Sequence, residues 1–112
     1  MSKADGAEVL ERLYATIRAR KGASAKTSYT ASLFKGGKAK IARKLGEEGL
    51  EAVLATQAGD KKGLVAESAD VLYHLLVAWA HAGIAPEKVW AELARREGVS
   101  GIEEKKSRSK RS

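Results

Sequence analysis

The sequence predicts an all-α protein, a helical bundle with four main helices per chain that assembles as a dimer. Four segments repeat apolar residues every three or four positions, which is the spacing of one helix face. No convincing pair of strands is evident, because the one short stretch that fits a strand has no partner. With 112 residues, the chain has room for one domain and not for a second.

The first expected helix begins with a capping box, in which Asp5 and Glu8 stand three residues apart. It is expected to end near Lys21 and Gly22. Between these ends, apolar residues at helical spacing predict one face that packs into the core. They are Val9, Leu10, Leu13, Tyr14 and Ile17.

Two short segments precede the next long helix. Residues 22–28 are small and polar, as in a loop. Residues 28–34 fit a short strand or a helical turn, and the lack of a partner strand favours the turn. A second loop is expected at 35–38, where Gly36 and Gly37 would let backbone N–H groups approach a phosphate. The full P-loop pattern is missing, so a simple turn is the preferred interpretation.

The helix expected over 38–57 is stopped by Gly59 and contains two internal glycines, Gly46 and Gly49. Each internal glycine costs roughly 1 kcal/mol of helix stability relative to Ala. The expected compensation is the close approach of a neighbouring helix or of a ligand.

The remaining helices are expected over 64–82 and from Pro86 to about Gly98. Proline suits the first position of a helix, and glycine suits the position just past its end. The polar composition beyond the last helix predicts a disordered basic tail at 107–112. The folded domain is therefore expected to span residues 1–106.

Both long helices are apolar on more than one side. In the first, Leu50, Val53 and Leu54 lie away from the stripe that contains Ile41. The second has a broad apolar face, separate from its acidic stripe. That face consists of Val65, Leu72, Leu75, Leu76 and Trp79. Because one bundle interior cannot use so many faces, we expect an obligate homodimer.

Two pairs of carboxylates lie among apolar neighbours on these helices. Glu48 and Glu51 form one pair, and Glu67 and Asp70 form the other. If the two faces pack together, the four carboxylates cannot all stay ionised unless a cation joins them. Hard oxygen ligands suit Mg²⁺, with Mn²⁺ as a substitute. The alternative is that they are solvated charges on exposed faces, which is the usual environment of Glu on a helix.

His74 stands one turn after Asp70, on the same stripe. It could help to hold a carboxylate or touch a substrate. An interior histidine with satisfied hydrogen bonds is the preferred interpretation.

The charge distribution indicates an anionic substrate. The formal net charge is +7, and no Asp or Glu occurs from Arg12 to Lys44, so the acidic pairs have basic surroundings. The alternatives are non-specific attraction to nucleic acid and a plain soluble surface.

The absence of Cys excludes disulfides and thiolate metal sites and fits a reducing compartment. The N-terminus lacks an apolar stretch and no run is long enough to span a bilayer, so we expect a cytoplasmic protein without membrane association.

Four stretches of the sequence are similar to known proteins, namely residues 28–30, 44–51, 67–77 and 98–105. The EExxE pattern at 47–51 and the ExxD pattern at 67–70 are shared with the wider, all-α MazG-like nucleotide pyrophosphohydrolases. With the run Tyr73-His74-Leu75-Leu76 and the SGxEEK-like segment at 100–105, the chain resembles in particular the phosphoribosyl-ATP pyrophosphatase family of histidine biosynthesis. Gly49, Leu50 and Ser68 are minor departures from it.

The resemblance implies a dimer of helical protomers and an Mg²⁺-dependent hydrolysis. The bond cleaved is the α–β phosphoanhydride of phosphoribosyl-ATP, and the products are phosphoribosyl-AMP and pyrophosphate. This is the second step of histidine biosynthesis.

The resemblance also suggests roles for particular residues. Glu47 is the candidate for orienting or deprotonating the attacking water, although it could instead bind a second ion. The expected Mg²⁺ ligands are Glu48, Glu51, Glu67 and Asp70. The phosphate-binding candidates, in falling order of preference, are Lys44, Lys38 and Lys40. For Lys44, the alternative is a helical salt bridge to Glu47 or Glu48.

Two other functions are compatible with parts of the sequence. A house-cleaning pyrophosphatase for canonical or damaged nucleoside triphosphates would share the same carboxylate pattern. A small nucleic-acid-binding module is supported by the net charge alone, and it leaves the carboxylate stripes unexplained. We therefore expect phosphoribosyl-ATP as the substrate and no nucleic-acid partner.

Overall fold

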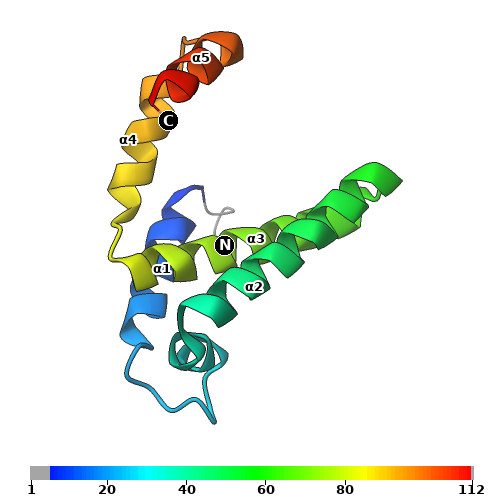
Figure 1. Ribbon diagram of the computed structural model, residues 1–112. Helices are drawn as coiled ribbons and strands as arrows, with labels where there is room; N and C mark the ends of the chain where they lie inside the picture. The colour runs from blue at the N-terminus through cyan, green and yellow to red at the C-terminus, as the bar shows by residue number, and fades with distance from the viewer. Residues whose placement is uncertain (1–5, 112) are drawn as a thin grey trace.

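The computed structural model describes residues 6–111, which form five α-helices and no strand (Figure 1). The helices are α1 (Glu8–Ala19), α2 (Tyr29–Ala58), α3 (Lys61–Ala82), α4 (Pro86–Arg96) and α5 (Gly101–Arg111). The predicted all-α class is confirmed, and a fifth helix among the described residues corrects the expected number of main helices. No helix in this range combines the length and the apolar content needed to cross a bilayer.

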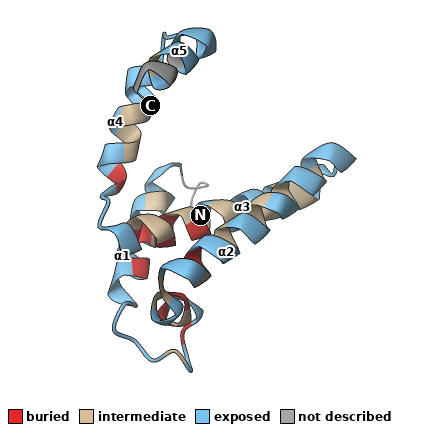
Figure 2. Cartoon of the chain, in the orientation of Figure 1, coloured by how far each residue is buried: buried red, intermediate tan, exposed pale blue. Residues whose placement is uncertain are grey.

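The core lies where α1, α2 and α3 meet. Its fully buried side chains are Ile17 of α1, Leu33 of α2, and Leu76 and Val77 of α3. Figure 2 shows these buried positions at one end of the α2–α3 pair, whereas the far end of the pair is exposed. The α2–α3 pair is therefore anchored by α1 at one end, and much of its length carries no cover from the described chain.

Helix α2 combines two expected segments into one element. The side chain of Ser28 accepts a hydrogen bond from the Ala31 N–H at 3.0 Å, so the helix begins at Tyr29 and the predicted helical turn is confirmed. The break expected at 35–38 is confirmed, but it is shorter than a loop, because only Gly37 leaves helical geometry and forms a kink between two helical segments. Its φ of 78° favours glycine, and the helix continues beyond this kink to Ala58.

A tight turn joins α2 to α3. Gly59 has a φ of 69°, and the Asp60 N–H donates to the Ala55 carbonyl oxygen at 3.0 Å, which closes the end of α2. The carboxylate of Asp60 then accepts from the Gly63 N–H at 2.8 Å and caps α3. Because of this cap, α3 begins at Lys61 rather than at 64 as expected.

Helix α1 is tied to the end of α3 by two long-range hydrogen bonds. The Tyr14 hydroxyl donates to the Ile84 carbonyl oxygen at 2.8 Å. After the helix, Lys21 Nζ donates to the Ala80 carbonyl oxygen at 3.3 Å. Helix α1 begins at Glu8, which is the residue expected three positions after the cap, so the expected capping box is not the cap seen. Asp5, the other residue of that box, lies outside the described residues.

Helix α4 begins at Pro86 as predicted and extends from the end of α3 (Figure 1). Its Trp90 indole N–H donates to Glu11 of α1 at 2.5 Å, and its ring meets Trp79 of α3 edge-on at 5.9 Å. Helix α5 includes residues 107–111, and the disorder expected at 107–112 stays a prediction. At its start, Ser100 Oγ accepts from the Glu103 N–H at 3.1 Å and caps the helix. The boundary at 106 stays a prediction, and residue 112 lies outside the described range.

Candidate active site

Three carboxylates from α2 and α3 converge beside the core. Glu48 of α2 and both Glu67 and Asp70 of α3 each offer an oxygen, and these oxygens lie within 4.8 Å of one another. We call these three residues the carboxylate trio. Glu48 and Glu67 are half-buried, and Asp70 is exposed. The turn at Gly59 brings α3 back along α2, which is why residues distant in sequence meet here.

The fourth predicted ligand, Glu51, does not join the trio. It lies on an exposed position of α2, one turn after Glu48. Its charge still acts on the trio through Glu67, as the pKa of that group shows. Three of the four carboxylates therefore converge as expected, and the charge of Glu51 acts on Glu67 at least as strongly as that of Glu48. The role of all four as metal ligands stays a prediction.

The carboxylate trio carries charge that its surroundings do not compensate. Desolvation raises the pKa of Glu67 above its ordinary value, and the carboxylates of Asp70, Glu51 and Glu48 raise it further. Repulsion of this kind is relieved by protonation or by a cation among the oxygens. The three side chains offer oxygen atoms and no sulfur or nitrogen, which suits a hard divalent ion.

Two of the glycines of α2, Gly46 and Gly49, leave open space near Glu48. A Cβ built on Gly46 or Gly49 would meet no atom of the described chain within 4 Å. The close approach of a neighbouring helix, which was one expected reason for these glycines, is therefore wrong within the protomer. The other expected reason, room for a ligand, stays a prediction.

The predicted water-activating residue is paired with the preferred phosphate-binding residue. Lys44 Nζ lies 3.4 Å from Glu47 Oε1, and Arg43 Nε lies 3.7 Å from Glu47 Oε2. This is the helical salt bridge that the sequence allowed as the alternative for Lys44. Because both side chains are partly exposed, such a pair contributes only about 0–1 kcal/mol. The catalytic roles of both residues stay predictions.

The other two lysines predicted for phosphate binding differ in their surroundings. Lys38 is exposed just after the kink in α2. Lys40 folds back over the kink, where its Nζ donates to the Ser32 carbonyl oxygen at 3.5 Å and its stem occupies the space beside Gly36. Lys40 thus braces the kink in this structure, which makes Lys38 the freer of the two.

His74 is an interior histidine with partners on both ring nitrogens, as the sequence favoured. The side chain is 4% exposed. Its Nδ1 lies 2.8 Å from the Asp70 carbonyl oxygen, which can only accept, so Nδ1 carries the proton. In the neutral ring, Nε2 is then the acceptor for the Tyr29 hydroxyl, 3.3 Å away. His74 therefore connects the backbone of the trio residue Asp70 to the start of α2.

Two residues beside His74 were given no functional role from the sequence. Tyr29 stacks against Tyr73 with ring centroids 6.3 Å apart, and the Tyr73 hydroxyl is hydrogen-bonded to the Thr30 hydroxyl. Burial raises the pKa of Tyr73. Tyr29 remains 52% exposed, so its ring is available next to the trio's helix. The Ser28-Tyr29-Thr30 stretch at the start of α2 is the sequence signal that could have indicated Tyr29. Its packing against α3 is a tertiary contact.

Comparison with known proteins agrees with the resemblance seen in the sequence. The family model described as phosphoribosyl-ATP pyrophosphohydrolase matches residues 10–97, which include the carboxylate trio and every predicted lysine. The phosphoribosyl-ATP pyrophosphatase of Azospirillum brasilense is 60% identical over 102 residues, or 91% of this chain and 92% of that protein. That of Paramagnetospirillum magneticum is 57% identical over 108 residues, or 96% of this chain and 99% of that protein. That of Rhodospirillum rubrum is 52% identical over 110 residues, or 98% of this chain and 94% of that protein.

Proposed function

Because the chain belongs to the phosphoribosyl-ATP pyrophosphohydrolase family, we propose that the carboxylate trio is the catalytic centre for Mg²⁺-dependent hydrolysis of phosphoribosyl-ATP. The protein is a phosphoribosyl-ATP pyrophosphatase by this family membership and acts in histidine biosynthesis. The bond cleaved is the α–β phosphoanhydride, which yields phosphoribosyl-AMP and pyrophosphate. The observation that carries the proposal is the convergence of Glu48, Glu67 and Asp70 in a chain of this family.

The trio fits a magnesium ion in chemistry and in spacing. Mg²⁺ prefers carboxylate oxygens at about 2.1 Å, so oxygens on opposite sides of one ion lie roughly 4.2 Å apart. The observed separation of up to 4.8 Å is close to this value, and small side-chain movements would complete the site. The raised pKa of Glu67 supports the same conclusion, because a cation would remove the repulsion that causes it.

Each residue of the site has a distinct task in this proposal. Mg²⁺, when bound, neutralises phosphate oxygens and polarises water. Glu48, Glu67 and Asp70 would hold the ion, and Glu51 adds negative charge one turn along α2. Glu47 accepts a proton from the attacking water after releasing Lys44, and Lys44 then binds a phosphate oxygen of the substrate. The exchange is energetically modest because the Lys44–Glu47 pair is partly exposed.

We also propose that the functional unit is a homodimer formed through α2 and α3. Large apolar side chains on these helices remain exposed in the protomer, and the fractions are 57% for Leu50, 56% for Val53, 51% for Leu54, 72% for Val65 and 41% for Leu72. Apolar surface of this kind on neighbouring helices favours burial against a second copy. A cytoplasmic location stays a prediction.

Pyrophosphate release from phosphoribosyl-ATP by the purified protein tests the function. We expect release with Mg²⁺ and its loss after chelation with EDTA, restored by added Mg²⁺ or Mn²⁺. Canonical and damaged nucleoside triphosphates serve as competing substrates in the same assay. A higher kcat/KM for any of these than for phosphoribosyl-ATP would favour the house-cleaning function instead.

A further inference from the structure

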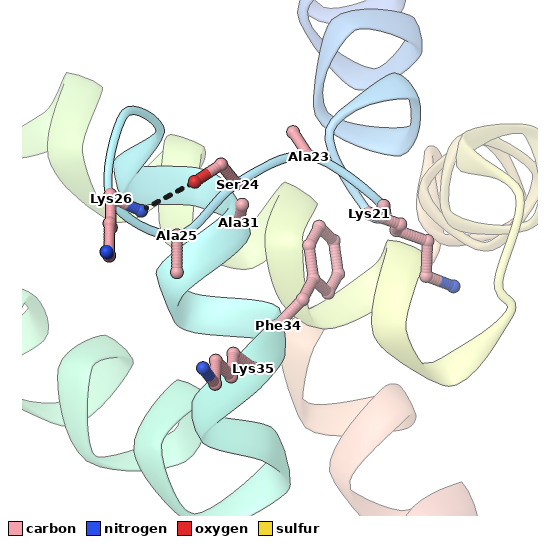
Figure 3. A pocket seen from close by; sticks show the side chains of 9 residues that line it. Lys21, Ala23, Ser24, Ala25, Lys26, Ala31, Phe34 and Lys35 are labelled. Carbon is pink, nitrogen blue, oxygen red and sulfur yellow. Dashed lines mark hydrogen bonds between the residues drawn. The ribbon is translucent and has the colours of Figure 1, made fainter.

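A second concave surface lies between the loop after α1 and the first half of α2 (Figure 3). This basic cleft has a volume of about 540 Å³ and is lined by residues 21–26 together with Ala31, Phe34 and Lys35. It shares no lining residue with the carboxylate trio. Its size is that of a site for a small molecule, for which volumes of roughly 300–1,000 Å³ are usual.

The charge of the cleft is entirely positive. Three of the residues that line it are lysines, and none is acidic. Lys21 is already engaged, since its ammonium donates to the Ala80 carbonyl oxygen and lies 5.5 Å from the centre of the Phe34 ring. Lys26 and Lys35 form no ion pair with any residue that the structure describes. In Figure 3 these two lie on one side of Phe34, and Lys21 lies on the other.

The rest of the cleft combines a held backbone with an apolar wall. Ser24 Oγ accepts a hydrogen bond from the Lys26 N–H at 3.2 Å, which leaves the hydroxyl hydrogen available to donate to a ligand. The Ser28 N–H donates to the Ser24 carbonyl oxygen at 3.0 Å, so the loop is braced before α2 begins. Phe34 and the buried Ala31 supply apolar surface against which the carbon skeleton of a sugar can pack.

We propose that the basic cleft binds a phosphate monoester through Lys26 and Lys35. Two unpaired ammonium groups and a hydroxyl donor match the charge and the acceptor oxygens of such a group. Phosphoribosyl-ATP carries one on its second ribose, in addition to the triphosphate that the trio would engage through a metal. Binding of that ribosyl phosphate is one source of the ligand and rests on the proposed function. A free sugar phosphate or inorganic phosphate is the other source.

A titration of the metal-free protein with ribose 5-phosphate, followed by amide chemical shifts in NMR, tests the cleft without any turnover. We expect saturable shifts at residues 24–26 and 31–35. In the Lys26→Ala/Lys35→Ala variant, the affinity for ribose 5-phosphate should fall on the order of tenfold or more. Lys88→Ala is the matched control, because it removes an exposed lysine on α4 that does not line the cleft. Its affinity should equal that of the wild type, and Lys26→Arg/Lys35→Arg should restore much of the binding.

Steady-state kinetics on the same variants identify the source of the phosphate. If the ribosyl phosphate of the substrate binds here, the double alanine variant raises KM for phosphoribosyl-ATP on the order of tenfold, and inhibition by ATP, which lacks that group, is unchanged. Weaker ribose 5-phosphate binding with an unaltered KM supports the cleft as a site for free phosphate. Absence of saturable shifts together with an unaltered KM would overturn the proposal, as would an equal loss of binding in Lys88→Ala. If the wild type releases no pyrophosphate from phosphoribosyl-ATP, the proposed function fails, and the titration still decides the cleft.

Discussion

The ring of His74 donates a hydrogen bond from Nδ1 to the carbonyl oxygen of Asp70, 2.8 Å away, one turn earlier in α3. The other ring nitrogen lies 3.3 Å from the hydroxyl of Tyr29 at the start of α2. Since His74 is buried, both contacts are costly to lose. His74 thus links the backbone of Asp70, a trio residue, to the first segment of α2, before the kink.

The first prediction concerns this link. Tyr29→Phe keeps the aromatic ring and removes the donor to His74, which leaves a buried acceptor unsatisfied. We expect the free energy of unfolding to fall by about 1 kcal/mol and kcat to fall as well, because the turn that carries Asp70 loses support. Denaturant unfolding and steady-state kinetics on one sample measure both.

Tyr14→Phe is the matched control for Tyr29→Phe. It removes the hydroxyl that donates to the Ile84 carbonyl oxygen, away from the trio, and should lower stability by a similar amount while sparing kcat. An unchanged kcat in Tyr29→Phe would show that the His74 link is structural alone.

The second prediction concerns the metal ligands. Glu48→Gln, Glu67→Gln and Asp70→Asn each keep the approximate shape of the side chain and remove one anionic oxygen ligand. Each should lose most activity, and Mg²⁺ binding measured by calorimetry should weaken in parallel. Glu51→Gln is expected to lose activity too, with a smaller effect on Mg²⁺ affinity, because Glu51 lies outside the trio. Near wild-type turnover at saturating Mg²⁺ in any two of the four would refute this ligand set.

The third prediction concerns stability without metal. The pKa of Glu67 is raised in the folded protein, so its ionised form opposes folding, and stability is lost as pH rises from the ordinary value of 4.5 through the raised one. In EDTA at neutral pH, Glu67→Gln should therefore have a higher thermal midpoint than the wild type. The difference should shrink as pH falls, because the wild-type carboxyl becomes protonated. A lower midpoint for Glu67→Gln in EDTA at neutral pH would contradict the repulsion among these groups.

The fourth prediction concerns Lys44. If its ammonium exchanges Glu47 for a substrate phosphate, Lys44→Ala should reduce kcat/KM strongly and leave the thermal midpoint almost unchanged, since the exposed pair contributes only about 0–1 kcal/mol. Steady-state kinetics and melting curves on the same sample provide the two readouts. Unaltered kinetic constants would leave the observed salt bridge as the only role of Lys44.

The fifth prediction concerns assembly. From the sequence, Leu76→Glu is expected to disrupt assembly or folding, and because Leu76 is 1% exposed within the protomer, the charge would act on the core. Val53→Glu and Leu54→Glu place charge on apolar side chains that the protomer leaves exposed. Sedimentation should show a dimer for the wild type and a folded monomer for the double variant. A well-folded wild-type monomer at micromolar concentration would contradict the proposed dimer.

The sequence by itself determined the helical class, the ends of α2 and α3, the start of α4 and the pairing of two acidic motifs. Helix ends depend on local signals, such as the left-handed glycine at position 59 and the proline at position 86, which act through neighbouring backbone groups. The meeting of Glu48 with Glu67 and Asp70 followed from local information as well, because a two-residue turn between two long helices sets them side by side.

The tertiary structure alone decided how the remaining polar side chains are used. Lys40 donates to the Ser32 carbonyl oxygen across the kink at Gly37, where two helical segments of α2 meet. The exclusion of Glu51 from the trio depends on how α2 and α3 face each other. The basic cleft exists because Lys21 anchors the loop to the end of α3, a contact between residues 59 positions apart. The spacing of apolar residues predicts each helix separately. These features depend on distances between helices, which only tertiary packing determines.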